Sequence, residues 1–85
     1  MTSFTYLIRD PMGLHARPAA VLAKRLQNEA CTVTVLCGTR KANAKGLFSL
    51  MSIAVKCDET VTVCVEGEDE AALAQELEVF FAENF

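Results

Sequence analysis

The sequence lacks any apolar run that approaches the ~20 residues needed to cross a bilayer. Its N-terminus, MTSFTYLIRD, also lacks the basic stretch followed by an apolar stretch that marks a secretory signal. We therefore expect a soluble, cytoplasmic protein that inserts into no membrane.

Metal-ligating residues are few and poorly spaced. The chain has one histidine and four cysteines, no two of which form a C-x-x-C pair. A structural zinc site normally needs such pairs, so we expect neither a metal nor another cofactor. A metal or redox module based on the cysteines remains the weakest alternative. Cys31 and Cys37 fall on the same face of the predicted strand as Val33 and Val35, which predicts that they are small apolar core residues with free thiols.

Basic residues are absent from the last third of the chain. Residues 58–85 carry nine acidic residues, whereas residues 1–57 carry all eight basic residues and only two acidic ones. The chain therefore presents a positive and a negative region to partners. A nucleic-acid partner is not expected, because the acidic third opposes it and no aromatic residues alternate with the basic ones.

The length of 85 residues fits a single domain spanning residues 1–85. With 52% hydrophobic and 22% charged residues, the chain is neither disordered nor fibrous. It is too short to hold separate catalytic and substrate domains. We therefore expect shallow surface chemistry or binding, and not a free-standing enzyme.

Two periodicities alternate along the chain. Strand-like alternation predicts strands at residues 2–8, 32–37, 40–43 and 60–66. Helical spacing of apolar residues predicts helices at residues 18–28, 47–53 and 70–84. Asp10 to Gly13 has the composition of a turn, and Asp69 is placed to cap the last helix.

The predicted order is β-α-β-β-α-β-α, and each strand has one apolar face. A sheet built from such strands has one wet face and one face covered by helices. The prediction is an α+β open-faced β-sandwich, with a four-stranded antiparallel sheet and three helices on one face.

The segment GLHARPAA, residues 13–20, carries the candidate chemistry. It places His15 just before a helix whose first turn holds Arg17 and Pro18. The first N–H groups of a helix lack internal partners and attract anions, and the helix dipole strengthens this. Arg17 adds a permanent cation matched to phosphate oxygens. A positive site disfavours the imidazolium form, and a neutral imidazole can attack phosphorus.

The chain resembles the HPr family, the histidine-containing phosphocarriers of the bacterial phosphoenolpyruvate-dependent sugar phosphotransferase system. GLHARPAA and NAKGLFSLMSIA, residues 43–54, carry the resemblance, which covers essentially the whole chain. It implies that His15 is phosphorylated on Nδ1 and that Arg17 steadies the phosphoryl group, with the backbone N–H groups of Ala16 and Arg17. Enzyme I would be the donor, EIIA domains of sugar permeases the acceptors, and the carrier a monomer.

The resemblance also implies a docking surface on the second helix. Leu47, Phe48 and Met51 match its exposed apolar patch, and Lys24 and Lys45 match basic positions around it. The helix 47–53 carries too many apolar residues for one buried face, so some must be exposed. The expected core members are Leu50 and Ile53.

One position departs from many Gram-positive members, where the second helix begins with a serine that an ATP-dependent kinase phosphorylates. Gly46 stands there instead and has no hydroxyl to modify. Ser49 and Ser52 lie inside the predicted helix and are poor substitutes. Two alternatives remain open. One is a paralogue serving another phosphoryl relay, nitrogen-related or for dihydroxyacetone. The other is a regulatory domain that binds an anion at the same helix end.

Overall fold

Seven elements follow one another in the order predicted from the sequence. The computed structural model describes residues 1–85. Its strands are β1 (Thr2–Leu7), β2 (Thr32–Cys37), β3 (Arg40–Asn43) and β4 (Thr60–Glu66). Its helices are α1 (Ala16–Leu26), α2 (Leu47–Ser52) and α3 (Glu70–Asn84). None of these helices has the length and apolar character that crossing a membrane requires.

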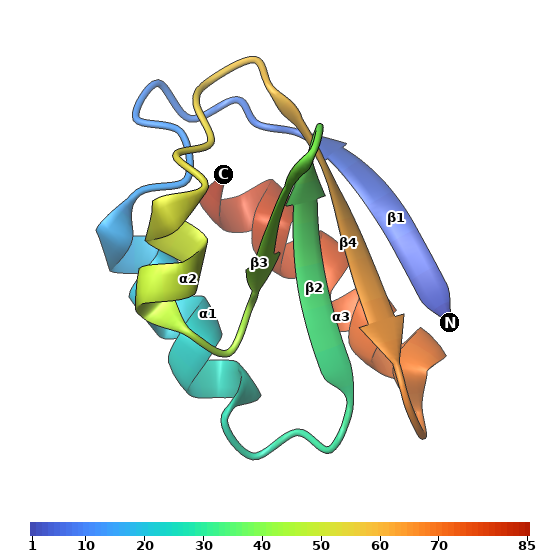
Figure 1. Cartoon of the computed structure of the whole chain (residues 1–85). Coiled ribbons are helices and arrows are strands. Elements are labelled where there is room, and N and C mark those ends of the chain that lie inside the picture. Colours follow the sequence, from blue (N-terminus) through green and yellow to red (C-terminus); the bar gives the residue numbers. More distant parts are fainter.

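The four strands form one antiparallel sheet in the order β1-β4-β2-β3 (Figure 1). β4 lies inside the sheet, where Val63 pairs with Phe4 on one side and with Val35 on the other. β2 and β3 form a hairpin that closes where Cys37 pairs with Arg40. The chain therefore crosses from β1 to β2 through α1, and returns from β3 to β4 through α2.

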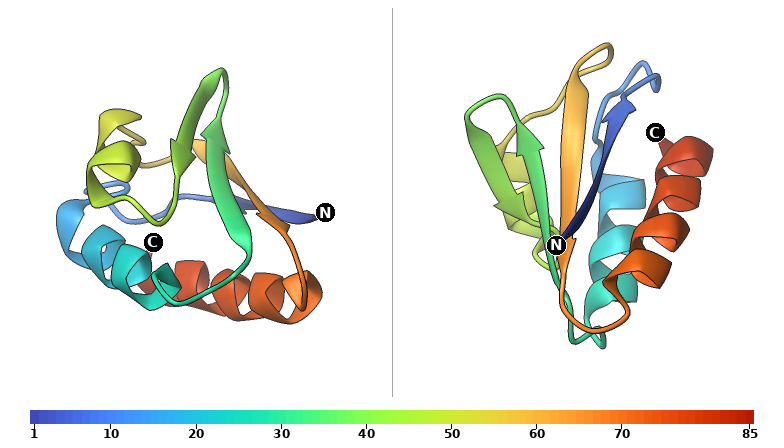
Figure 2. Two further views of the ribbon diagram at one scale, coloured as in Figure 1. Left: turned by 60° about the horizontal axis from the view of Figure 1, so that its bottom comes forward. Right: turned by 90° about the vertical axis from the view of Figure 1, so that its right-hand side faces the viewer.

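The helices cover only one side of this sheet. Along β2 and β4 the valines are buried, whereas Thr32 and Thr60 are exposed. α1 and α3 lie side by side against the valine face (Figure 2). α2 is shorter and contacts both α1 and β3. This arrangement confirms the predicted open-faced sandwich, and the other sheet face remains uncovered.

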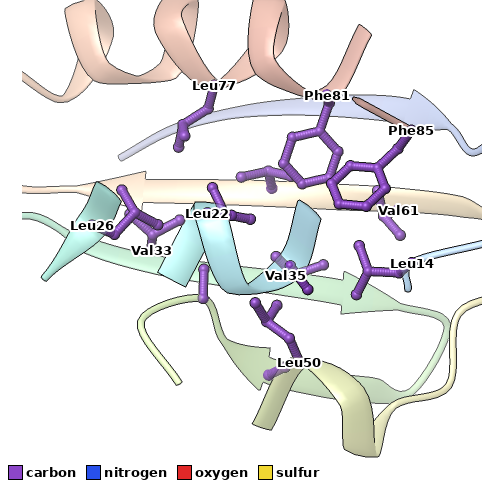
Figure 3. Packing of buried hydrophobic residues seen from close by; sticks show 14 of the residues in the cluster. Leu14, Leu22, Leu26, Val33, Val35, Leu50, Val61, Leu77, Phe81 and Phe85 are labelled. Carbon is purple, nitrogen blue, oxygen red and sulfur yellow. The ribbon is translucent and has the colours of Figure 1, made fainter. Parts of the chain in front are cut away.

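The core is filled from the sheet and from all three helices. Figure 3 shows Leu77 and Phe81 of α3 on one side and Leu50 of α2 on the other. Phe81 is fully buried, and its ring meets the rings of Phe4 and Tyr6 edge-on at centroid distances of 5.9 Å. Such edge-to-face pairs are favoured by the quadrupoles of the rings. They connect α3 firmly to β1.

The predicted packing of two cysteines is confirmed. Cys31 and Cys37 are buried in the core, and all four thiols in the chain are free. No cluster of histidine, cysteine and acidic side chains is arranged to hold a metal ion.

Most predicted boundaries are confirmed, and the main difference is at α1. The helix begins at Ala16 instead of Pro18 and ends two residues earlier than predicted. The reason is that the carbonyl of His15 already accepts a 3.1 Å hydrogen bond from the N–H of Ala19. β1 and α2 each end one residue before the predicted limit.

The predicted cap of α3 is wrong in its mechanism. Asp69 occupies the N-cap position, but it is left-handed, with φ of 59°, and its side chain makes no capping bond. The Glu70 carboxylate instead accepts the N–H of Gly67 at 3.3 Å. A hydrogen bond from the Thr2 hydroxyl and the nearby ammonium of Met1 hold the pKa of Glu70 below its usual value. The acidic first turn thus ties α3 to the start of β1.

Candidate functional site

The loop between β1 and α1 is pinned to the body of the protein. The carbonyl of Asp10 accepts the N–H of Gly13 at 2.8 Å, and the N–H of Leu14 donates to the carbonyl of Val55 at 3.0 Å. Gly13 has φ of 69°, and a Cβ there would overlap that Val55 oxygen. Only glycine satisfies both constraints without strain. The anchored loop therefore holds His15 in one position directly before α1.

His15 is the N-cap residue of α1, with extended backbone angles. The N–H groups of Ala16 and Arg17 meet no acceptor within the chain, and Pro18 has no N–H to offer. These two free donors point outward from the positive end of the helix dipole. They form the anion-attracting helix end that the sequence predicted.

The His15 ring lies partly exposed at this helix end, with 23% of the side chain accessible. Its Nε2 lies 3.1 Å from Oδ2 of Asp10, and its plane meets the Phe85 ring edge-on at 6.5 Å. Nδ1 has no hydrogen-bond partner within the chain. The ring is therefore held through one nitrogen while the other remains free.

Asp10 was not predicted as a site residue. Its Oδ1 accepts the N–H of Met12 at 2.9 Å, which is the local bond of an Asx turn. This bond, followed by the hydrogen bond with His15, lowers the pKa of the Asp10 carboxyl. The turn composition was visible in the sequence and could have suggested that bond. The sequence placed only positive groups around His15, so the structure adds a carboxylate to the site.

A shallow hollow of about 300 Å³ lies beside the ring. Its lining residues are His15, Arg17, Pro18, Val21, Glu83 and Asn84. The exposed Arg17 side chain makes no hydrogen bond or ion pair within the chain. The C-terminal end of α3 was not expected here, because no local pattern reports a contact between residues so far apart in sequence.

Among the apolar residues of α2 and Ile53 just after it, the two predicted core members are buried, whereas only Phe48 of the predicted docking patch is strongly exposed. Leu50 and Ile53 are buried. Phe48 is 89% exposed, while Leu47 and Met51 are partly buried against the core. An isolated, nearly fully exposed phenylalanine contributes nothing to the core.

The two lysines of the predicted docking surface differ in their freedom. Lys24 is exposed on α1 and makes no ion pair. The ammonium of Lys45 donates to the backbone carbonyl of Glu29 at 2.6 Å. The side chain of Gln27 in turn donates to the carbonyl of Lys45 at 2.6 Å. Lys45 is thus tied just beyond the C-terminal end of α1, next to which α2 packs (Figure 1).

Gly46 is the N-cap residue of α2, as predicted. Its φ of −111° is open to any residue, and a Cβ built there would lie 3.4 Å from the Cβ of Ser49. Ser49 accepts the N–H of Asn43 through Oγ, and Ser52 donates its hydroxyl to the Ser49 carbonyl. Backbone geometry therefore does not require glycine at position 46.

These features suit the reversible capture of a small anion on a nucleophile. Nδ1 of His15 makes no hydrogen bond within the chain, while two backbone N–H groups and Arg17 lie ready for negative oxygens. The partial exposure leaves room for a second protein to approach the ring.

Comparison with known proteins agrees with this geometry. The model of the family described as the PTS HPr component phosphorylation site matches residues 2–83. The phosphocarrier protein HPr of Mycoplasma capricolum is 35% identical over 81% of this chain and 78% of its own. A solved Mycoplasma histidine-containing phosphocarrier protein has a TM-score of 0.92 at 29% identity, covering 96% of this chain and 93% of that one.

A third relative is known as a dimer. Bacillus subtilis Crh, a catabolite repression protein solved as a swapped dimer, has a TM-score of 0.76 at 32% identity, covering 98% of this chain and 95% of that one. The family match spans nearly the whole sequence, and the fold agrees element by element. The chain belongs to the HPr family, the phosphocarriers of the phosphotransferase system.

Proposed function

We propose that this protein accepts a phosphoryl group on Nδ1 of His15 from phosphorylated enzyme I and passes it to EIIA domains of sugar permeases in the cytoplasm. The observation that carries the proposal is the unpartnered Nδ1 at the N-terminus of α1, beside free N–H groups and the unpaired Arg17.

The chemistry follows from that arrangement. The Nδ1 lone pair attacks phosphorus, and the phosphoryl oxygens are met by the N–H groups of Ala16 and Arg17 and by the guanidinium. The product is a phosphoramidate at the surface, with no lid over it. Such a group suits onward transfer to an acceptor better than long-term storage.

Partner docking is assigned to the surface formed by Phe48, Leu47 and Met51 of α2 with Lys24 of α1. An apolar centre with a basic rim suits a transient complex. Phe48 supplies the largest exposed apolar area on this surface. We assign Lys45 a smaller electrostatic role, because its ammonium already bonds to the backbone.

The carrier is proposed to work as a monomer and without the kinase-operated serine switch. Gly46 offers no hydroxyl, and both nearby serine hydroxyls already make hydrogen bonds within the chain. Light scattering at micromolar concentration measures the oligomeric state. A stable dimer would overturn the monomer assignment while leaving the transfer chemistry open.

The test combines the protein with enzyme I and labelled phosphoenolpyruvate, followed by addition of an EIIA domain. Wild type is expected to acquire one acid-labile, base-stable label and to lose it to EIIA. The His15→Ala variant, which keeps the helix end, is expected to stay unlabelled. Label retained on His15→Ala, or no label on folded wild type, would overturn the proposal.

A further inference from the structure

We propose that Asp10 is a positioning residue that sets the tautomer of His15. Its carboxylate keeps the ring proton on Nε2 and so leaves the lone pair on Nδ1. This inference rests on the proposed phosphoryl transfer and adds a second residue to its machinery. Asp10 does not touch phosphorus in this scheme, since it acts through the ring.

Three hydrogen bonds to backbone groups fix Asp10 independently of the His15 ring. Its N–H donates to the backbone oxygen of Phe85 at 2.8 Å, and its carbonyl accepts the N–H of Gly13 at 2.8 Å. Its Oδ1 accepts the N–H of Met12 at 2.9 Å. With one carboxylate oxygen used in this way, the other oxygen remains for His15 at 3.1 Å. The side chain therefore has little freedom to turn away.

The direction of the hydrogen bond follows from the chemistry of the two groups. An ionised carboxylate can only accept, so the nitrogen facing it must carry a proton. The lowered pKa of Asp10 supports an ionised carboxylate at neutral pH. In a neutral imidazole one nitrogen is protonated and the other is not. The proton on Nε2 therefore places the lone pair on Nδ1, which is the nitrogen without a partner.

No other charged group competes for Nε2. Arg17 and Glu83 line the hollow beside the ring, but neither forms a hydrogen bond with it. Arg9 and Cys57 lie near Asp10 in sequence or space, yet neither forms an ion pair with the carboxylate. The Phe85 ring faces the imidazole edge-on and offers no acceptor, and the backbone oxygen of Phe85 accepts the N–H groups of Arg9 and Asp10 instead of a bond from Nε2.

The transfer step balances with this tautomer. The Nδ1 lone pair forms the new N–P bond, while the bond from phosphorus to the donor's leaving atom breaks and its electron pair leaves with the donor. No proton has to leave Nδ1, because none is there. On onward transfer the N–P bond breaks and its pair returns to Nδ1. Since Nε2 keeps its proton throughout, the leaving group is a neutral imidazole and never an imidazolate.

The decisive variant is Asp10→Asn, because it should invert the tautomer. The Met12 N–H needs an acceptor, so the amide oxygen takes that place and the amide NH₂ faces Nε2. An NH₂ group donates, which draws the lone pair to Nε2 and the proton to Nδ1. The same exchange of carboxylate for amide produces the wrong histidine tautomer in serine-protease triads.

The first readout needs no partner protein. ¹⁵N NMR of the neutral ring distinguishes the two tautomers directly. Wild type is expected to be almost wholly Nε2–H, and Asp10→Asn to show a large Nδ1–H fraction. Asp10→Ala, which removes the contact without reversing it, is expected to fall between them. A purely structural role for Asp10 would not shift this signature in a variant with an unchanged fold.

The second readout is the rate of labelling by phosphorylated enzyme I. The pair is only partly buried, so Asp10→Asn should slow the single-turnover rate roughly 10- to 100-fold, less than in a fully enclosed triad. The matched control is Asp69→Asn, which removes the same charge from an exposed residue far from His15. The left-handed backbone of Asp69 accepts asparagine as readily as aspartate. It is expected to label at the wild-type rate.

The outcomes separate the two proposals. If wild type is labelled but Asp10→Asn matches it in tautomer and rate, the role of Asp10 is refuted and the carrier function stands. If folded wild type is not labelled, the carrier function fails whatever the NMR shows. Circular dichroism checks the fold of each variant. Should Asp10→Asn misfold, the tautomer of Asp10→Ala decides, and an unchanged wild-type signature there refutes the inference.

Discussion

Replacing Phe48 by alanine should separate partner docking from folding. The side chain is 89% exposed and therefore contributes almost nothing to the folded core. Phe48→Ala is expected to leave the unfolding free energy within about 0.5 kcal/mol of wild type. A partner that covers the ring would lose its largest apolar contact. The variant should thus fold normally and dock poorly.

The size of the docking loss follows from the exposed area. A phenylalanine offers roughly 200 Å², so with 89% exposed a partner could cover about 180 Å². At ~25 cal/mol per Å² the ceiling is about 4.5 kcal/mol. Ordering costs reduce this, and truncation of an aromatic anchor commonly costs about 1–2 kcal/mol. The KM for the carrier should therefore rise roughly 5- to 30-fold.

The assay is steady-state transfer from enzyme I at varied carrier concentration, together with thermal unfolding. Phe48 lies on the docking surface and not at the ring, so kcat should change less than KM. Leu50→Ala on the same helix is the matched control, because Leu50 is fully buried. It should lose about 2–5 kcal/mol of stability. A wild-type KM for Phe48→Ala, or an unfolding loss like that of Leu50→Ala, would refute the reasoning.

Four further predictions follow from the same structure. Gly13→Ala should lose about 2 kcal/mol of stability or more, because a left-handed backbone is combined with overlap on the Val55 carbonyl. Gly38→Ala, at φ of 63° with no atom near the added Cβ, should lose only the stability that the left-handed backbone costs. Equal losses of unfolding free energy for the two variants in urea would contradict this account. Gly46→Ser should keep its melting temperature, because the added Cβ meets only ordinary contacts, and should become a substrate for the ATP-dependent kinase. Wild type is expected to show no phosphoserine by mass mapping. Hydrogen bonds from the N–H of Lys56 and, second, from Arg40 lower the pKa of Glu59 in the folded protein. The ionised Glu59 therefore stabilises the fold above pH 4.5, the ordinary value, and this stabilisation is lost as pH falls through the lower folded-state pKa. Urea midpoints from pH 7 to 3 should show that loss, and Glu59→Gln should reduce it. Transfer should also slow at high salt if charge steers the encounter, and a rate independent of salt would exclude steering.

The sequence predicted the strands and α3 well because their signals are local. Alternation of threonine and valine in β2 and β4 determines both the strand and its buried face. Helical spacing around Leu73 and Leu77 does the same for α3. The start of α1 was misplaced because Pro18 was read as the first helical residue. It is the third, where its missing N–H is equally harmless.

The site was only half visible in the sequence. His15 and Arg17 stand together in one short motif, so their meeting at a helix end needed no tertiary information. The contacts of His15 with Asp10 and Phe85 depend on how the loop folds back against α3. Periodicity says nothing about such an arrangement. The left-handed backbone of Asp69 was also missed, because its capping role was predicted from the residue type, which does not determine the backbone angles.

The anchored loop before α1 has a consequence for the speed of the relay. Because Gly13 and Leu14 hold the loop in place before any partner arrives, docking need not freeze a moving segment. Even a fleeting encounter can then be chemically productive, and affinity need not be high. We expect turnover to be governed by how fast the two proteins collide and separate, with the carrier itself adding no rearrangement of its own.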